Sequence, residues 1–139
     1  MTIRKLIFIA LSFFSFTSFS AYARTPVPIV NYENVAVTTA SGKSATAEQV
    51  KQAFLSAGER RNWTFTEPSA NQMIGTLNVR NKHTIMINIA YTGEHYSITY
   101  SNSVNMKYEL KNGKPVIHPY YNDWVKELLD GLRIEFNKY

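Results

Sequence analysis

Hydrophobic and polar residues alternate from residue 63 to residue 101, which is typical of β-strands with one buried face. The stretches "WTFT", "GTLNV", "TIMINIAY" and "HYSITYS" show this period of two, and short connections separate them. The pattern predicts an antiparallel meander of about four strands. Because one of its faces is apolar and the other polar, we expect helices to cover the apolar face.

The alternation also predicts which residues face each other across neighbouring strands. A type II′ turn at Gly93-Glu94 matches apolar with apolar residues in the last two strands. A three-residue loop over 81–83 does the same for the preceding pair, whereas a two-residue loop mixes the faces. The expected pairs are Tyr91 with Tyr96, Ile89 with Ile98, Ile87 with Tyr100, Asn88 with Thr99, Val79 with Ile85, Leu77 with Ile87, Phe65 with Met73 and Trp63 with Gly75.

Two segments outside the strands repeat their apolar residues at helical spacing. The first is a predicted helix over 46–58, in which Thr46 and Gln49 form a capping box and Gly58 stands where a left-handed C-terminal cap is expected. The second starts within "KPVIHPYYNDWVKELLDG", with either Pro119 in its first turn or Asn122 as its N-cap. Its apolar stripe consists of Tyr121, Val125, Leu128, Leu129, Leu132 and Phe136.

The remaining segments carry weaker patterns. Residues 24–43 read as an extended lead-in that contains two prolines. Residues 102–117 contain Asn112-Gly113, which favours a tight hairpin turn, but Pro115 restricts that segment to a sheet edge or a loop. The sequence therefore predicts a single two-layer α+β domain over 24–139, with an N-terminal and a C-terminal helix on one face of the sheet.

The first 23 residues have the composition of a secretory signal peptide. Basic Arg4 and Lys5 precede an apolar stretch over 6–19, and Ala21-Tyr22-Ala23 is the small-x-small pattern of a cleavage site. The apolar stretch is shorter than the roughly 20 residues that span a bilayer. We expect cleavage after Ala23, a periplasmic or secreted protein, and no stable membrane anchor after cleavage.

Composition narrows the function classes. The chain has no cysteine, which excludes disulfides, thiolate metal sites and a lipidated cysteine. The net charge of +5 becomes +3 without Arg4 and Lys5, and the basic residues are scattered along the sequence. Because nucleic-acid binding favours a basic stripe with interleaved aromatic residues, we expect no nucleic-acid partner.

The sequence gives little support for a catalytic or a metal-binding site. His83 and His95 lie at opposite ends of one predicted strand, about 30 Å apart at 3.3 Å per residue, so they cannot join His118 in one zinc site. No G-x-S-x-G elbow, glycine-rich phosphate loop or converging pair of carboxylates is present. We expect no cofactor and no metal, and the sequence argues against an enzyme without excluding one.

Two groups of residues remain as candidate sites. The polar face of the predicted sheet carries an uncharged row that could bind an envelope protein, a glycan or a second copy of the chain: Thr76, Asn78, Met86, Asn88, Thr99 and Ser101. Alternatively, this face is merely solvated or lies beneath the lead-in. The second candidate is a small-ligand pocket or active site at the junction of helix and sheet, formed by His118, Tyr121 and Trp124. A third hypothesis is an inhibitor of an envelope-attacking enzyme. Oligomeric state is left open.

The C-terminal half resembles small exported bacterial proteins of unknown function, among them lipoprotein-like members. The shared patterns are Y-S-I-x-Y-x-x-S, here from Tyr96 to Ser103, and I-H-x-x-Y-N-x-W, here from Ile117 to Trp124. The resemblance implies export and assigns no activity and no site residues. This chain departs from the lipoprotein-like members because it lacks the lipidated cysteine, so the resemblance does not imply a membrane tether.

Overall fold

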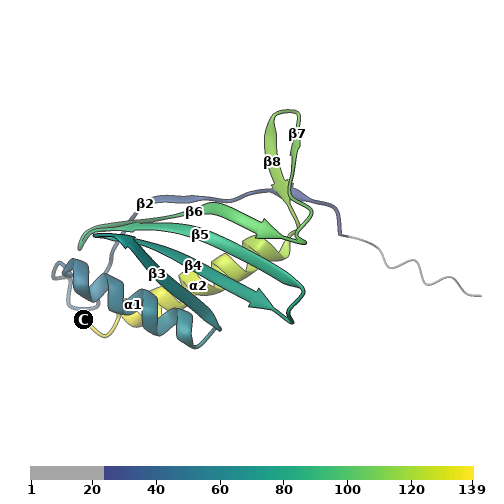
Figure 1. Cartoon of the computed structure of the whole chain (residues 1–139). Coiled ribbons are helices and arrows are strands. Elements are labelled where there is room, and N and C mark those ends of the chain that lie inside the picture. The colour runs from purple at the N-terminus through teal and green to yellow at the C-terminus, as the bar shows by residue number, and fades with distance from the viewer. Residues whose placement is uncertain (1–23) are drawn as a thin grey trace, which may run out of the picture.

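A computed structural model describes residues 24–139 of the chain, and the expected signal peptide at 1–23 lies outside the described residues. The elements in chain order are β1 (Val27–Pro28), β2 (Tyr32–Ala36), α1 (Ala47–Glu59), β3 (Trp63–Ser69), β4 (Gln72–Val79), β5 (His83–Tyr91), β6 (His95–Val104), β7 (Glu109–Lys111), β8 (Lys114–Ile117) and α2 (Tyr120–Phe136). The predicted α+β class with antiparallel strands is confirmed (Figure 1).

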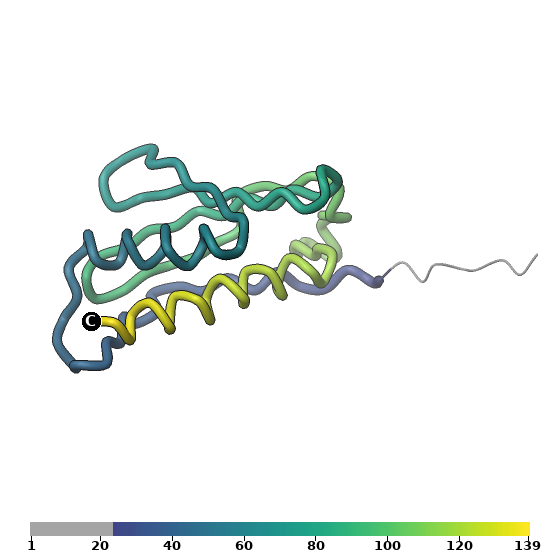
Figure 2. Tube along the Cα trace, turned by 90° about the horizontal axis from the view of Figure 1, so that it is seen from below, coloured from purple at the N-terminus to yellow at the C-terminus, as the bar shows by residue number. Residues whose placement is uncertain are grey.

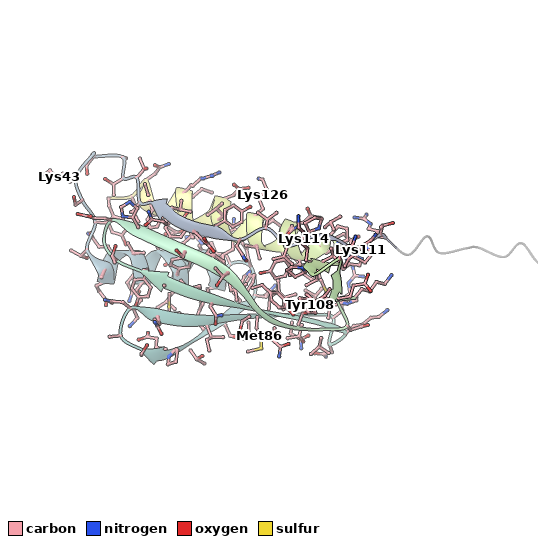
Figure 3. The ribbon with its side chains drawn as sticks, turned by 90° about the horizontal axis from the view of Figure 1, so that it is seen from above. Lys43, Met86, Tyr108, Lys111, Lys114 and Lys126 are labelled. Atoms are coloured by element: carbon pink, nitrogen blue, oxygen red, sulfur yellow. The ribbon has the colours of Figure 1, made fainter. Side chains whose placement is uncertain are left out.

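The predicted four-strand meander is present as β3-β4-β5-β6, but the structure adds a fifth strand to it and has a second, smaller sheet. The larger sheet has the order β2-β6-β5-β4-β3, because the lead-in supplies β2 as a fifth strand beside β6. The smaller sheet has the order β1-β8-β7. Both helices lie on one side of the larger sheet, as Figure 2 shows from below. Figure 3 shows the opposite side, which no helix covers.

The core lies between the larger sheet and the helices. The inward-facing strand residues, including Ile85, Ile87 and Ile89, are buried against Phe54 of α1 and Leu128 of α2. Every second residue of β5 is buried, which is the period of two seen in the sequence. Burial of this apolar face explains why the helices dock on one side only.

The predicted register is correct for β5 and β6 and displaced for the other two strand pairs. Tyr91 pairs with Tyr96 and Asn88 with Thr99, as expected. In β4–β5 and β3–β4 the pairs are displaced by two residues, so that Leu77 faces both Ile85 and Trp63. A two-residue shift keeps every side chain on its face, so alternation alone could not distinguish the two registers.

Gly58 is not a helix cap, because α1 continues through it to Glu59. A Cβ atom at Gly58 would lie 2.3 Å from Cε2 of Phe65, and one at Gly75 would lie 3.1 Å from Cε1 of the same ring. The two glycines thus border the ring of Phe65 in β3. The expected pairing of Trp63 with Gly75 was wrong, because the register places Phe65 opposite Gly75 and Trp63 opposite Leu77.

The β5–β6 turn is closed differently from the expected type II′ turn. Gly93 does not have the positive φ that this turn requires. Instead, the backbone N–H groups of Glu94 and His95 both donate to Oγ1 of Thr92, at 3.1 Å each. Glycine is required here for space, since a Cβ at Gly93 would lie 2.2 Å from the carbonyl oxygen of Ala45, just before α1.

The two helix starts follow the sequence signals to different degrees. The capping box of α1 is confirmed, with the N–H of Gln49 donating to Oγ1 of Thr46 at 3.1 Å. Of the two starts considered for α2, the structure has the earlier one, with Pro119 at the N-cap position. The N–H of Tyr120 donates to Nδ1 of His118 at 3.1 Å, so His118 caps the helix from outside it.

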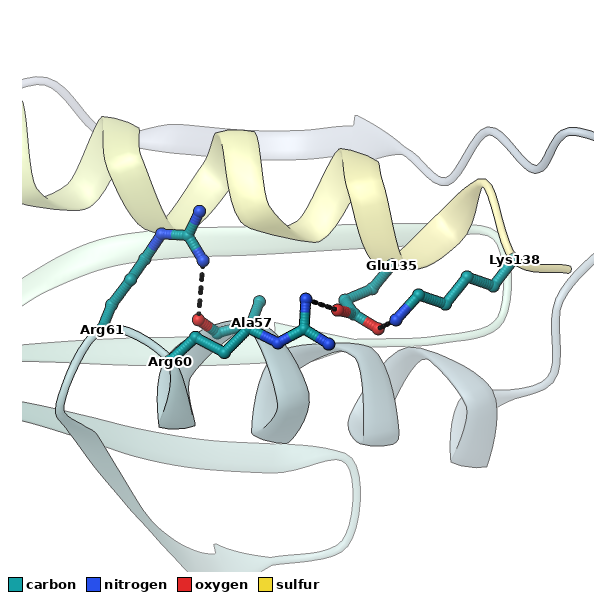
Figure 4. Close-up of polar contacts among 5 residues, drawn as sticks. All are labelled: Ala57, Arg60, Arg61, Glu135 and Lys138. Atoms are coloured by element: carbon teal, nitrogen blue, oxygen red, sulfur yellow. Dashed lines mark hydrogen bonds and ion pairs between the residues drawn. The ribbon is translucent and has the colours of Figure 1, made fainter.

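Polar contacts join the C-terminal end of α1 to α2 (Figure 4). The buried carboxylate of Glu135 accepts from Arg60 at 3.3 Å and from Lys138 at 2.6 Å. Arg61 Nη1 donates to the carbonyl oxygen of Ala57 at 3.0 Å, and a Cβ at Gly131 would lie 2.5 Å from the same nitrogen. Gly131 therefore marks a close approach of α2 to Arg61, not a break in the helix.

The lead-in is tied down by two asparagine side chains. Asn122 of α2 accepts from the N–H of Val30 at 3.0 Å and donates to the carbonyl oxygen of Pro28 at 2.9 Å. Asn31 accepts from the N–H of Tyr100 at 3.0 Å. The lead-in therefore extends the edge of the sheet beside β6 and does not cover the sheet face that the helices leave open (Figure 1).

Residues 109–117 form a hairpin at one end of the molecule. Asn112 and Gly113 have φ angles of 52° and 75°, as in the turn expected from the Asn-Gly pair. β8 lies between β1 and β7, so Pro115 occurs within the middle strand of the small sheet and not on an edge. The hairpin projects from the body on the side away from the helices (Figure 1). None of the helices within residues 24–139 has the length and apolar character needed to cross a membrane.

Candidate binding surface

The candidate surface is the side of the larger sheet opposite the helices, which we name the outer face. Its side chains alternate with the buried residues of the same strands. On β4, β5 and the part of β6 from Ser97 onward they are Gln72, Ile74, Thr76, Asn78, Thr84, Met86, Asn88, Ala90, Ser97, Thr99, Asn102 and Val104. None of these twelve residues is an aspartate, glutamate, lysine or arginine. Exposed faces of antiparallel sheets usually carry charges that discourage strand association, so an uncharged face is unusual.

The structure brings most of the predicted binding residues together. Thr76 lies opposite Met86, and Asn88 lies opposite Thr99 at the centre of the outer face. Asn78 is opposite Thr84, at the end of the outer face next to the β4–β5 turn. Hydroxyl and amide groups both donate and accept hydrogen bonds, so this row can bind a ligand rich in hydroxyl groups.

Ser101, the remaining predicted residue of the row, lies in an irregularity of β6. The register shifts between Met86 and Ile87, whose partners are Asn102 and Tyr100, and Ser101 is the extra residue between them. Asn102 thus takes the position that simple alternation assigns to Ser101. The shift also turns Ser103 inward, where its Oγ lies 2.9 Å from the hydroxyl oxygen of Tyr100.

The outer face contains a shallow central hollow. Its volume is about 250 Å³, and its lining includes Pro68, Ile74, Asn88, Ala90, Ser97 and Thr99. The register of β3 and β4 shifts between Thr66 and Ser69, which places Pro68 at the rim of the hollow. The hollow combines apolar carbon atoms with hydroxyl and amide groups, a combination found in small-ligand sites.

A second hollow lies where β6 leads toward the hairpin. This corner hollow has a volume of about 550 Å³, and its lining includes Ser101, Asn102, Ser103, Asn105, Lys107 and Tyr108. The ring of Tyr108 stacks on the ring of Tyr100, and 44% of Tyr108 remains exposed. Sequence reasoning missed Lys107 and Tyr108. Alternation gave no signal there, since the segment between β6 and β7 is irregular.

The second predicted group does not line either hollow. Tyr121 is fully buried in the core, and its hydroxyl has no hydrogen-bond partner among the described residues. Trp124 is half-buried at the surface, with its ring centroid 5.5 Å from that of Tyr120 and 6.5 Å from that of His83. The structure therefore separates Tyr121 from the surface that His118 and Trp124 reach.

His118 is held in its neutral form by its surroundings. Burial, followed by the positive charges of Lys107 and Arg24, lowers the pKa of this imidazole. A neutral ring agrees with its role as hydrogen-bond acceptor for the N–H of Tyr120. Within residues 24–139, no three His, Cys, Asp or Glu side chains gather in a way that could hold a metal ion.

No protein-family model matches the chain, and no curated protein matches its sequence. The chemistry of the outer face is therefore the basis for assigning a function.

Proposed function

We propose that the chain is an exported, non-enzymatic binding domain and that its outer face binds a glycan. The observation that carries the proposal is the composition of that face, in which hydroxyl, amide and apolar groups replace the charges usual on an open sheet. Sugars present many hydroxyl groups and apolar C–H faces. A surface of the same mixed character can pair with both.

The geometry adds two features that suit a chain-like ligand. The central hollow and the corner hollow both involve β6, and the corner hollow contains the exposed ring of Tyr108. An aromatic ring with a polar end provides a flat apolar platform and a hydrogen-bonding group in one side chain. None of the twelve outer-face residues named above carries a carboxylate, and the imidazole of His95, at the start of β6, does not line the central hollow, an arrangement that favours binding over hydrolysis.

A glycan array tests this proposal with the domain 24–139 and one matched pair of variants. Asn88→Lys places a charge at the centre of the outer face, and Asn137→Lys makes the same change at an exposed position after α2. We expect the unmodified domain and Asn137→Lys to bind the same glycans and Asn88→Lys to lose them, with all three proteins equally folded by circular dichroism. Absence of any bound glycan, or equal binding by Asn88→Lys, would overturn the proposal.

A further inference from the structure

The basic residues that look scattered along the sequence gather at one end of the folded domain. We name this the hairpin end: it comprises the β7–β8 hairpin, the β4–β5 turn, the segment from β6 to β7, Arg24 and the first turn of α2. Its basic residues, all exposed, are Arg24, Arg80, Lys82, Lys107, Lys111 and Lys114. Its two acidic residues are Glu109 and Asp123.

Contacts between distant segments bring these residues together. Asn105 donates to the carbonyl oxygen of Lys82 at 3.1 Å, which joins the β4–β5 turn to the segment before the hairpin. The guanidinium of Arg24 lies 4.5 Å from the centroid of the Tyr120 ring, which joins the N-terminal lead-in to α2. Figure 3 shows Lys111 and Lys114 at this end and Lys43 at the opposite end.

The hairpin end and the rest of the described domain carry net charges of opposite sign. Six basic and two acidic residues give the hairpin end a net charge of +4, whereas the other seven basic and eight acidic residues of 24–139 give −1. All five ion pairs among the described residues are in the second part, for example Lys51 with Glu67 at 2.7 Å. The positive charges of the hairpin end are therefore unpaired within the described chain.

This positive end directly adjoins the outer face. The corner hollow contains residues of both, since Ser101 and Asn102 come from β6 and Lys107 leads into the hairpin. The hairpin rises on the same side of the sheet as the outer face (Figure 1). A polymer lying along the outer face would meet a field of positive charge at one end, which would attract negative groups on that polymer.

On this basis we infer that the ligand of the outer face is an acidic polysaccharide, whose negative groups lie against the unpaired basic residues of the hairpin end. This inference rests on the proposed glycan binding and specifies the class of glycan. An anionic membrane surface fits less well. Within the hairpin only Leu110, at 65% exposed, is a large apolar side chain open to solvent, and the acidic Glu109 precedes it. The exposed rings of Tyr108 and Tyr120 at this end pack against Tyr100 and Arg24. Binding at a lipid interface relies on a broader apolar face.

Two polymers with the same backbone test the inference. Polygalacturonate carries a carboxylate on each sugar, and its methyl ester is neutral. We expect the domain to bind polygalacturonate more tightly than the ester in calorimetric titration, and expect added salt to remove the difference, because salt screens exposed charges.

The matched variants each remove two exposed lysine charges, from different parts of the domain; of these four lysines, only Lys126 forms an ion pair among the described residues, with Asp130 at 2.7 Å. Lys111→Gln with Lys114→Gln removes two charges from the hairpin, and Lys43→Gln with Lys126→Gln removes two from exposed positions elsewhere. We expect the hairpin variant to bind polygalacturonate about tenfold more weakly, which corresponds to 1.4 kcal/mol and suits two exposed charge pairs. We expect its binding of the ester to stay unchanged, and the control variant to retain its affinity for both polymers.

Several outcomes would overturn the inference. They are equal effects of the two charge variants, equal affinity of the unmodified domain for both polymers, and tighter binding of phosphatidylglycerol vesicles or of a single-stranded oligonucleotide than of polygalacturonate. The glycan proposal can survive the first two outcomes if Asn88→Lys still loses the neutral ester, to which the charge of the new lysine adds no net attraction. Conversely, if Asn88→Lys binds the neutral ester normally, the outer face is not the glycan site, whatever the lysine variants show.

Discussion

The ring of Tyr108 lies parallel to the ring of Tyr100, with 4.9 Å between their centroids and 3° between their planes. Tyr100 belongs to β6 at its register shift, and Tyr108 directly precedes β7. The contact therefore couples the irregular part of the sheet to the projecting hairpin. It also sets the position of the exposed aromatic ring in the corner hollow.

Tyr108→Ala removes this contact, whereas Tyr108→Phe keeps the ring. We expect the alanine variant to lose about 1 kcal/mol of unfolding free energy, the usual contribution of an aromatic pair. We also expect faster amide exchange in β7 and β8 and weaker glycan binding. In the phenylalanine variant, the amides of the hairpin should exchange at the same rate as in the parent. Hydrogen-exchange mass spectrometry measures the effect, and equal protection in both variants would contradict the role of the stack.

Gly58→Ala should destabilise the domain although alanine favours helices. The new methyl group would come within 2.3 Å of the Phe65 ring, and such overpacking typically costs about 1–3 kcal/mol. This exceeds the gain of about 1 kcal/mol from helix propensity. Urea denaturation gives the difference in unfolding free energy.

Two further variants show whether the ring of Phe65 causes that loss. In a Phe65→Leu background the cost of Gly58→Ala should shrink, because the ring that it meets is gone. Gly131→Ala meets only the end of the flexible Arg61 side chain, so we expect a change within about 1 kcal/mol. A Gly58→Ala protein as stable as the parent would show that the Phe65 ring moves away from the new methyl group without loss of unfolding free energy.

The hydroxyl groups of Tyr121 and Tyr100 should respond oppositely to replacement by phenylalanine. The Tyr121 hydroxyl is buried without a partner among the described residues, so its removal should raise stability by about 1 kcal/mol. The Tyr100 hydroxyl lies 2.9 Å from Oγ of Ser103, so its removal should lower stability by about 1 kcal/mol. Thermal and chemical unfolding measure both changes, and a loss of stability in Tyr121→Phe would reveal an interaction of that hydroxyl.

Alkaline pH should destabilise the domain through its buried tyrosines. Burial raises the pKa of Tyr96 from its ordinary value of 10.0 to about 12 and also raises the pKa of Tyr121. In the unfolded chain these phenols lose their protons near pH 10, whereas in the folded domain they keep them. The stabilisation is therefore complete below pH 10 and is lost as the pH rises toward 12.

Tyr96→Phe should reduce the loss of unfolding free energy at alkaline pH, because it removes one of the groups whose pKa differs between the folded and unfolded states. Urea denaturation at pH 8 and at pH 11 gives the slope for the parent and the variant. Between pH 7 and pH 9 both slopes should agree. A parent and variant with equal losses between pH 8 and pH 11 would contradict the contribution of Tyr96.

The sequence correctly predicts those structural elements whose signals come from residues close together in the chain. The capping box at Thr46 and Gln49, the stripe of α2 and the pairing of Tyr91 with Tyr96 follow from residues close together in sequence. The pattern failed where alternatives satisfy it equally. A two-residue displacement in β3–β4 and β4–β5 preserves the faces, and nothing local identified the ring of Phe65 as the neighbour of Gly58.

For the candidate surface, too, some features could be predicted from the sequence and others could not. Alternation was enough to place Thr76, Met86 and Asn88 on one uncharged face, because side chains two residues apart in a strand share a face. It could not reveal the irregularity at Ser101 or the corner hollow beyond it. Those features depend on how β6 ends against the segment that leads into the hairpin.

The amino-acid sequence is enough to predict the α+β class, the two helices and the uncharged character of one sheet face. Each depends on the period of side-chain direction within a single segment. Three other features depend on how the chain folds in space: β2 joins the sheet, the hairpin projects beside the outer face, and unpaired charges as distant in sequence as Arg24 and Lys114 share one end. Electrostatic fields depend on distance in space, which the order of residues along a chain does not show.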